Sequence, residues 1–198
     1  MTIETWTDRE YADPVPYLRH RAELIRSLGP PLEDGDRLVD LACGDGGLAD
    51  FLPGLEYIGV DADPRMVEEA AVKGRAIVHA DLNDFTPDGP VSATSLFRAL
   101  YYARDRSRFF RHVAGYTTKK VVFDLNPRQY RVEDVHSDLR AAGWAEVAMR
   151  PFFVSQTRAL PGPVGAALML AERGGPAARL ALRYRFTYLV AAWPDSTG

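Results

Sequence analysis

A glycine-rich segment that begins with an acidic residue is the part of the chain whose residue types point most directly to ligand binding. Residues 40–47 read Asp-Leu-Ala-Cys-Gly-Asp-Gly-Gly and stand between an apolar run and an expected helix. Glycine lets the backbone approach a ligand closely and adopt a positive φ where a turn needs it. The helix that follows would present free N–H groups to acceptor atoms of that ligand. The segment therefore predicts a backbone cradle for a polar ligand.

Two further aspartates, Asp61 and Asp81, follow the next two apolar runs and suit the polar groups of a nucleoside. A carboxylate such as Asp61 can accept two hydrogen bonds from a ribose diol, and charged acceptors make the stronger bonds. Asp81 can accept from an exocyclic amine, while Leu82 can pack on the face of a base. Asp40 can accept from a cationic or hydroxyl-bearing part of the same ligand. Because open α/β sheets bind ligands outside the carboxyl ends of their strands, we expect these acids to share one crevice.

The elements that must position these residues alternate between short apolar strands and helices. We expect strands at 38–42, 57–60, 76–78, 91–97, 119–125 and 147–154, and helices at 13–28, 48–51, 63–73, 104–114, 132–142 and 164–170. This alternation predicts a parallel sheet that helices cover on both faces. Residues 180–190 alternate strictly between apolar and polar side chains, a pattern typical of an antiparallel strand with one wetter face.

In this order and spacing, the glycine segment and the acidic strand ends resemble the class I S-adenosylmethionine-dependent methyltransferases. The matching residues are 40–46, 59–63 (Gly-Val-Asp-Ala-Asp) and 79–82 (His-Ala-Asp-Leu), and the order of elements extends the resemblance beyond them. The resemblance implies one domain over 1–198, with a lid helix within 1–30 and an α/β core over 36–198. It also implies a Rossmann-like three-layer sandwich whose seven-stranded, mostly parallel sheet has the order 3-2-1-4-5-7-6 and an antiparallel last strand.

The resemblance further implies methyl transfer from S-adenosylmethionine, with S-adenosylhomocysteine as product, to an O, N or C atom of a small-molecule acceptor. In the family the glycine loop lies under the methionine and ribose parts of the cofactor. The second-strand acid binds the ribose hydroxyls, and the third-strand acid binds the adenine amine. Carried over to this sequence, the cofactor-binding residues are Asp40, Ala42, Cys43, Gly44, Gly46, Asp61, Ala62, Asp81, Leu82, Phe97 and Tyr11. Ala42 stands where the family has its first loop glycine, and no residue is identified as a catalytic base.

Residues after the fourth and fifth expected strands are candidates for binding the acceptor. The cofactor methyl must face these strand ends, because the adenosine would occupy the other side, over the second and third strands. The candidates, with one tyrosine of the first helix, are Tyr17, Arg98, Tyr101, Tyr102, Asn126, Arg128 and Tyr130. The tyrosines offer apolar walls with hydroxyl groups, and the arginines can pair with an acidic acceptor. Ordinary packing and surface turns remain alternative explanations of the same residues.

Two other classes of protein fit parts of the same pattern. Residues 44–49 also match the GxGxxA pattern of dinucleotide-binding proteins, with Asp61 near the expected offset. A single-domain NAD(P)-dependent oxidoreductase is therefore one alternative, although Asp40 and Asp81 disfavour it. The other alternative is a protein that holds an adenosyl ligand without turnover. Binding of S-adenosylhomocysteine and NADH separates the first alternative from a methyltransferase, and only a substrate screen separates the second.

The composition argues against several functional classes. The chain of 198 residues has a formal net charge of −3, whereas nucleic-acid binders usually carry a basic footprint. No apolar run approaches the ~18 residues of a membrane helix, and the first residues lack the features of a signal peptide. The single cysteine allows no internal disulfide, and the four histidines show no metal-ligand spacing. We expect a cytoplasmic protein, monomeric or homodimeric, with no catalytic metal and no nucleic-acid or membrane partner.

Overall fold

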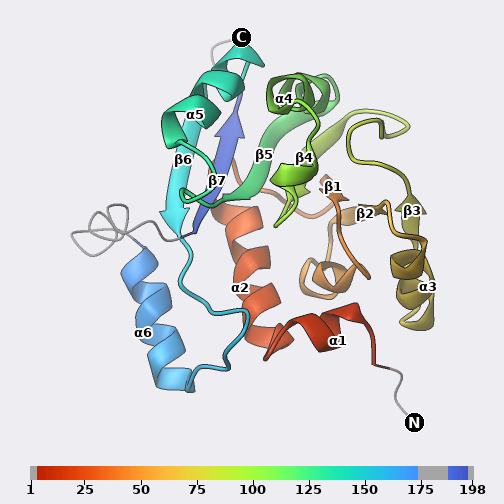
Figure 1. Ribbon diagram of the computed structural model, residues 1–198, viewed down its shortest axis with the longest axis vertical. Helices are drawn as coiled ribbons and strands as arrows, with labels where there is room; N and C mark the ends of the chain where they lie inside the picture. The colour runs from red at the N-terminus through yellow and green to blue at the C-terminus, as the bar shows by residue number, and fades with distance from the viewer. Residues whose placement is uncertain (1–3, 174–186, 196–198) are drawn as a thin grey trace.

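The computed structural model describes residues 4–173 and 187–195, which build a seven-stranded sheet flanked by helices (Figure 1). The strand order is β3-β2-β1-β4-β5-β7-β6, and neighbours are parallel except where β7 runs antiparallel to β5 and β6. The strands are β1 (Arg37–Leu41), β2 (Glu56–Asp61), β3 (Ile77–His79), β4 (Val91–Leu96), β5 (Thr117–Leu125), β6 (Glu146–Pro151) and β7 (Tyr188–Trp193). The expected α/β class, strand order and antiparallel last strand are confirmed.

Several helices begin where the sequence provides caps. The carboxylate of Asp63 accepts a hydrogen bond from the backbone N–H of Arg65, and Pro64 follows it at the first helical position. Asp105 accepts from the N–H of Arg108 at the start of another helix. The helices are α1 (Trp6–Glu10), α2 (Pro14–Ser27), α3 (Pro64–Val72), α4 (Arg106–Ala114), α5 (Val132–Ala141) and α6 (Gly162–Glu172), with short 3₁₀ helices η1 (Gly47–Phe51) and η2 (Leu100–Tyr102).

The sheet separates two hydrophobic cores, because successive side chains of a strand point to opposite faces. On β1, Val39 packs in the core that includes α4 and α5, whereas Leu38 packs in the core that includes α2 and η1. Val121 and Val122 of β5 divide between the two cores in the same way. Figure 1 shows α4 and α5 side by side, in agreement with the contacts between them. The expected three-layer sandwich is confirmed, and the carboxyl ends of its parallel strands meet at one edge.

The N-terminal region differs from the expected lid helix. The helix expected over 13–28 is present as α2, but Leu24 and Ile25 bury it against the sheet, so it forms part of a layer. A separate short helix, α1, precedes it and was not expected. Its signal is visible in retrospect, since Thr5 and Asp8 form a capping box at its start. Figure 1 shows α1 below the strands, at the same edge of the sheet as the glycine segment.

The last strand also differs from its expected character. Of the expected strand at 180–190, residues 180–186 lie outside the described residues, and β7 begins at Tyr188. It pairs with β5 on one side and β6 on the other, and Tyr188 to Ala192 are all buried. The expectation of a wetter face is wrong for this part, because a strand in the interior of a covered sheet has no face toward solvent. The preceding strand, β6, ends at Pro151 rather than at 154.

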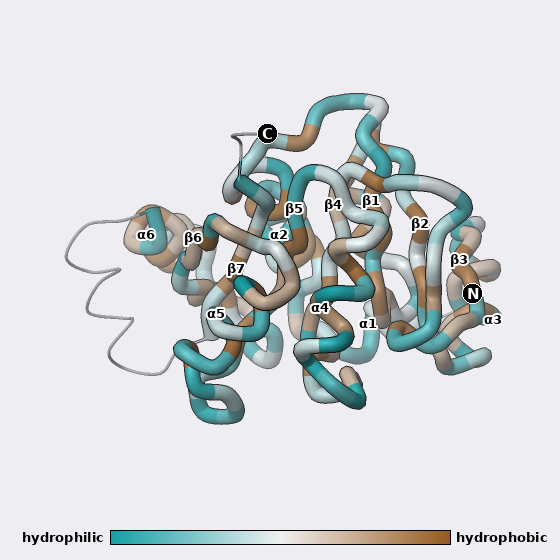
Figure 2. The backbone as a smooth tube through the Cα atoms, turned by 90° about the horizontal axis from the view of Figure 1, so that it is seen from above, coloured by the Kyte–Doolittle hydropathy of each residue, from teal (hydrophilic) through white to brown (hydrophobic). Residues whose placement is uncertain are grey.

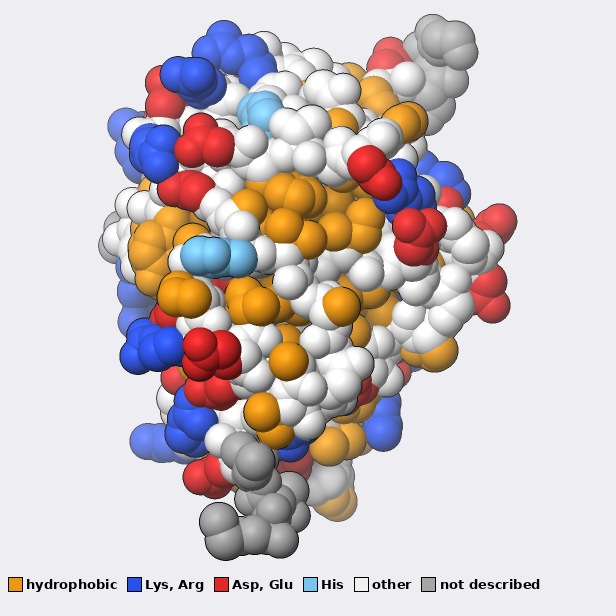
Figure 3. All heavy atoms as spheres, turned by 90° about the vertical axis from the view of Figure 1, so that its right-hand side faces the viewer, with side chains coloured by type: hydrophobic (Ala, Val, Ile, Leu, Met, Phe, Trp, Pro, Cys, Tyr) orange, Lys and Arg blue, Asp and Glu red, His pale blue; other side chains and the backbone are white. Residues whose placement is uncertain are grey.

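Two surface features complete the fold. The strand β3 forms an edge of the sheet, and Figure 3 shows apolar side chains gathered on this side of the molecule. Val72 of α3 and Val78 of β3 are among the exposed apolar residues. At the opposite side α6 lies at the periphery beside β6 (Figure 2), with Val164 and Leu170 exposed. None of the described helices combines the length and the apolar character that crossing a bilayer requires.

A buried lysine links β5 to the end of α2. Lys120 is fully buried, and its ammonium donates hydrogen bonds to the carbonyls of Leu28 (2.8 Å) and Arg26 (3.3 Å). These carbonyls end a helix and have no partner within it, so the lysine acts as a C-terminal cap. Burial and the neighbouring Lys119 lower the pKa of Lys120 to about 8. The folded chain therefore releases this proton well below the ordinary value of 10.5.

We expect the free energy of unfolding to rise with pH between about pH 8 and pH 10.5 through Lys120. In this window the unfolded chain binds a proton that the folded lysine has released, so raising the pH favours the folded state by a few kcal/mol. Urea unfolding at several pH values should show a steeper rise for wild type than for Lys120→Met. The variant Lys119→Met removes the smaller cause of the shift and leaves Lys120 buried, so its rise should begin at a higher pH than in wild type but should still exceed that of Lys120→Met. Identical slopes in wild type and Lys120→Met would contradict the assignment.

Candidate functional site

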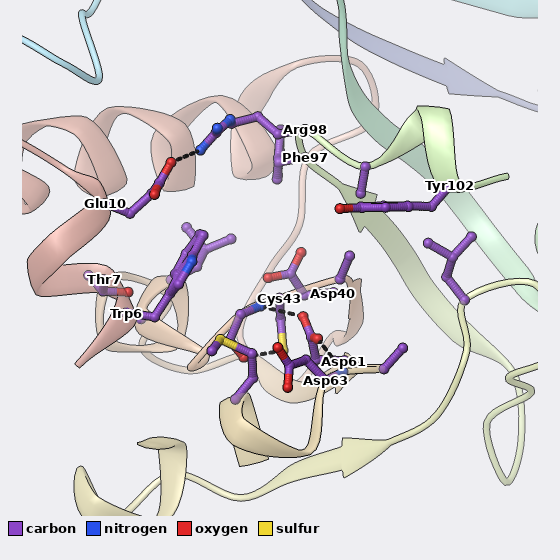
Figure 4. Close-up of a pocket in the computed structure, with 18 of the residues that line it drawn as sticks. Trp6, Thr7, Glu10, Asp40, Cys43, Asp61, Asp63, Phe97, Arg98 and Tyr102 are labelled. Atoms are coloured by element: carbon purple, nitrogen blue, oxygen red, sulfur yellow. Dashed lines mark hydrogen bonds and ion pairs between the residues drawn. The ribbon is translucent and has the colours of Figure 1, made fainter. Parts of the chain in front are cut away.

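A cavity of about 730 Å³ opens at the carboxyl ends of β1, β2 and β4. Asp40 at the end of β1 and Asp61 at the end of β2 line its floor, and Asp81 lines it beyond the end of β3. Figure 4 shows Asp40, Asp61 and Asp63 together on one side of the cavity, with Trp6 and Thr7 beside them and Tyr102 facing them. The expected crevice of acidic strand ends is therefore present.

The carboxylate of Asp61 fixes the glycine loop. One oxygen accepts a hydrogen bond from the N–H of Gly44 (2.8 Å), and the other accepts from the N–H of Asp63 (2.9 Å). Each oxygen keeps a second lone pair for a ligand hydroxyl. Burial raises the pKa of Asp61, while the two N–H bonds oppose this shift. Asp61 is thus held in one orientation before any ligand binds.

Backbone conformation in the loop explains its residue types. Gly44 and Gly46 have φ of 61° and 70°, values that L-residues rarely adopt. A Cβ on Gly44 would lie 2.7 Å from the ring of Trp6, so a larger residue would displace α1 from the loop. Ala42 also has a positive φ, 55°, at the position where glycine was expected from the resemblance. An alanine tolerates this conformation at a modest energetic cost.

Side chains of the two neighbouring strands form hydrogen bonds with the carboxylate of Asp40. Its two oxygens accept hydrogen bonds from the hydroxyl of Ser95 on β4 (2.6 Å) and that of Tyr57 on β2 (2.7 Å). Only 3 % of the residue is exposed, and this burial raises the pKa of Asp40. The carboxylate therefore faces the cavity as a rigid acceptor.

Asp81 differs from the other two acids because both its oxygens already carry strong donors. One oxygen accepts from the backbone N–H and the side-chain amide of Asn83, and the other pairs with the guanidinium of Arg104 at 2.6 Å. The bonds from Asn83 and the charge of Arg104 lower the pKa of Asp81. A ligand amine at this carboxylate must therefore share it with Arg104 or displace that side chain. Leu82 is buried beside it, as a residue that packs on a base would be.

The helix α1 closes the cavity over the glycine loop. The carboxylate of Asp45, which is fully buried, accepts hydrogen bonds from the hydroxyls of Thr5 and Thr7 and from the N–H of Thr7. On the other side the N–H of Trp6 donates to the carboxylate of Glu69. Side chains of α1 and of the loop therefore form one unit at the large cavity.

A second cavity of about 470 Å³ adjoins the first one. Arg98, Ala99 and Tyr101 line both cavities, so this segment forms their common wall. Arg98 has a positive φ of 53°, its N–H donates to Asp124 at 2.6 Å, and its guanidinium pairs with Glu10 at 2.8 Å (Figure 4). A strained backbone of this kind is typical of functional sites.

Most of the candidate residues lie in one or other cavity. Those that line the large cavity are Asp40, Ala42, Cys43, Gly44, Asp61, Ala62, Asp81, Leu82, Phe97 and Tyr11, together with Tyr102 of the acceptor candidates. Those that line the second cavity are Tyr17, Arg98, Tyr101, Asn126 and Tyr130. Gly46 and Arg128 line neither cavity. Lining residues that sequence reasoning did not identify include Trp6, Glu10, Arg21 and Asp124.

The thiol of Cys43 is not set up as a nucleophile. Burial, together with the charges of Asp40 and Asp61, raises the pKa of Cys43 well above its ordinary value. The group therefore stays a thiol at neutral pH, whereas nucleophilic catalysis needs the thiolate. Within residues 4–173 and 187–195 no group of three or more His, Cys, Asp or Glu side chains is arranged to hold a metal ion. The absence of a catalytic metal stays a prediction.

Comparison with known proteins identifies sequences that are similar to this chain. A family model described as a methyltransferase domain matches residues 39–123. The chain is 25% identical over 122 residues to a trans-aconitate 2-methyltransferase of Escherichia coli O157:H7, covering 59% of this chain and 48% of the relative. It is 34% identical over 89 residues to a trans-aconitate 2-methyltransferase of Mycobacterium tuberculosis, covering 43% of this chain and 33% of the relative. The chain thus spans about half, or less, of the length of these curated relatives.

Solved structures show the same fold. A chain in the complex of the Haloferax volcanii Trm112 methyltransferase activator with a methyltransferase superposes with a TM-score of 0.68 at 20% identity, covering 98% of this chain and 96% of that chain. Magnesium protoporphyrin IX methyltransferase from Synechocystis PCC 6803, with bound S-adenosylmethionine, superposes with a TM-score of 0.62 at 14% identity, covering 98% and 86%. In its matched domain, its strand order and the acidic strand ends around its glycine loop, this chain is similar to the class I S-adenosylmethionine-dependent methyltransferases.

Proposed function

We propose that this chain transfers the methyl group of S-adenosylmethionine to a small-molecule acceptor, with S-adenosylhomocysteine as the product. The observation that carries the proposal is the carboxylate of Asp61, which holds the N–H of Gly44 at the floor of the large cavity. This arrangement leaves lone pairs for two ribose hydroxyls. Asp40 and Asp81 at the neighbouring strand ends are then available to the methionine and adenine parts of the same ligand. The methyltransferase model matched over 39–123 supports this assignment.

The proposed acceptor site is the second cavity. It adjoins the large cavity at Arg98, Ala99 and Tyr101, so an acceptor there would meet the methyl end of the cofactor. Its volume of about 470 Å³ suits a small molecule rather than a macromolecule. The name of the relatives, trans-aconitate 2-methyltransferase, supports a carboxylate oxygen as the nucleophile. Tyr17 and Asn126 would supply polar contacts from the cavity wall.

In the proposed methyl transfer, the main role of the chain is to position the two reactants. When bound, S-adenosylmethionine supplies an electrophilic methyl group on a sulfonium, which leaves as a neutral thioether. No departing anion needs stabilisation, so the walls of the two cavities serve to hold the acceptor in line with the methyl group. Such positioning can remove roughly 7–11 kcal/mol of the barrier. A carboxylate acceptor is already ionised at neutral pH, and its attack needs no general base.

Titration calorimetry with S-adenosylhomocysteine and NADH tests the cofactor, and transfer of labelled methyl groups tests the reaction. We expect S-adenosylhomocysteine to bind and NADH not to bind, because Asp61 and Asp81 match the ribose and adenine of an adenosyl ligand without a pyrophosphate. We expect trans-aconitate, or another small carboxylic acid from a panel, to become methylated. Binding of NADH alone would favour an oxidoreductase. Binding of S-adenosylhomocysteine without turnover on the whole panel would favour a protein that only binds the ligand.

A further inference from the structure

A buried arginine of α2 has too few partners for its charge. Arg21 is 5% exposed, its guanidinium donates a hydrogen bond to the hydroxyl of Tyr17 at 2.5 Å, and the phenol of Tyr11 also lies within hydrogen-bonding reach. Its Nε is buried without a hydrogen-bond partner. No described carboxylate forms an ion pair with it, whereas Arg98 nearby is paired with Glu10. Buried charges are normally paired, because removing an unpaired ion from water is costly.

The surroundings of Arg21 keep it charged. Its guanidinium lies 4.1 Å from the centre of the Phe97 ring and 4.7 Å from that of Tyr17, and both rings attract a cation. Burial acts to lower the pKa of Arg21, but the surrounding phenol and carboxylate oxygens, those of Tyr17 foremost, raise it overall. Aromatic rings hold a guanidinium in place without using its N–H donors. The Nε–H of Arg21, which has no partner among the described residues, is therefore available to an anion.

Arg21 also stands where the two cavities approach each other. Its own side chain lines the large cavity, while its partner Tyr17 lines the second one. The charges of Asp124, which lines the second cavity, and of Asp40, which lines the large one, both help to raise the pKa of Arg21. A guanidinium with free N–H donors at such a junction matches the planar geometry of a carboxylate, which it can bind through two parallel bonds.

We propose that Arg21 is a carboxylate-binding residue at the junction of the two cavities. The inference rests on the proposed function, which brings two carboxylates to this place. One is the α-carboxylate of the methionine part of the cofactor. The ammonium group of the same methionine part would face Asp40. The other is the carboxylate of an acidic acceptor held in the second cavity. Both sources present the same chemistry to Arg21, and the experiment separates them.

The test uses calorimetry on the full chain and on Arg21→Met, which keeps the length of the side chain and removes its charge. If the cofactor supplies the carboxylate, affinity for S-adenosylhomocysteine falls by about 10- to 100-fold, the usual worth of a charge-assisted bond. Affinity for 5′-methylthioadenosine, which has no carboxylate, then stays unchanged. If the acceptor supplies it, S-adenosylhomocysteine binds as before, and binding of trans-aconitate to the S-adenosylhomocysteine complex falls instead.

Two results would overturn the proposal. One is unchanged binding of S-adenosylhomocysteine together with no loss of trans-aconitate binding. The other is an equal loss of affinity for S-adenosylhomocysteine and 5′-methylthioadenosine, which would make Arg21 a structural residue. Arg21→Gln carries the same expectations and replaces Arg21→Met if that variant does not fold. Failure of wild type to bind S-adenosylhomocysteine would instead refute the proposed function, so the two failures are distinguishable.

Discussion

Substitution of Asp61 by alanine is expected to lower the affinity for S-adenosylhomocysteine by at least about 100-fold, since each of two charge-assisted bonds is worth about 1.5–3 kcal/mol before water compensates. The same substitution frees the N–H of Gly44, which Asp61 now fixes at 2.8 Å. The loop would then have to be ordered by the ligand itself. Titration calorimetry with wild type and Asp61→Ala measures both the affinity and the added entropic cost.

A matched control for this experiment is Asp63→Ala. Asp63 lies two residues away and also lines the cavity, but its carboxylate is committed to capping α3 and to Arg65. Its removal should lower the free energy of unfolding by about 1 kcal/mol, as loss of a helix cap does. Affinity for S-adenosylhomocysteine should change only a few-fold. Normal affinity in Asp61→Ala, or equal losses in the two variants, would refute the assignment of Asp61 to the ribose.

Substitution of Asp45 by alanine is expected to have the largest effect on stability. Asp45 is 0% exposed and accepts hydrogen bonds from Thr5 and Thr7, while Arg75 lies 3.5 Å from it. Removing its carboxylate leaves buried donors without a partner, at a cost of about 3 kcal/mol or more. Urea unfolding should show this loss. The helix α1 should also detach, which trypsin would detect as faster cleavage after Arg9.

The control for Asp45 is Asp50→Ala. Asp50 is the other partner of Arg75, at 2.6 Å, but half of its side chain is exposed. Exposed pairs contribute at most about 1 kcal/mol, so this variant should keep nearly the stability of wild type. S-adenosylhomocysteine should bind more weakly to Asp45→Ala than to Asp50→Ala, since α1 covers the large cavity in which we propose that the cofactor binds. Equal protease resistance of the two variants would contradict the role of Asp45 as the anchor of α1.

The sequence sufficed to predict those parts of the site that depend on backbone topology. Asp40 and Asp61 meet because parallel strands end at one edge of a sheet, and their places after apolar runs identified those ends. The positive φ of Gly44 is likewise a local property, and a glycine in a turn predicts it. Arg21 had no such signal. It is a polar residue in an amphipathic helix, and only the tertiary fold brings Phe97 over its guanidinium.

The two wrong or missing expectations have physical causes of the same kind. The alternation before Tyr188 predicts a half-exposed strand, but the position of a strand within a sheet is set by pairing that no local pattern encodes. The helix α1 has only five residues, too few for a periodic apolar face, and its stability comes from Asp45 and Glu69 elsewhere in the chain. In both cases long-range contacts outweigh the local signal.

The interior place of β7 has a consequence for the synthesis of this protein. A ribosome releases β5 and β6 well before Tyr188–Trp193, yet those two strands are joined only through this later segment. Until it emerges, each exposes an unpaired row of N–H and C=O groups, which is a template for pairing with another chain. The β1–β5 part can assemble during translation, since domains of nascent chains fold from the N-terminus. The β5–β7–β6 part can form only after the last strand has emerged, and we therefore expect the newly made chain to be most prone to aggregation in this interval.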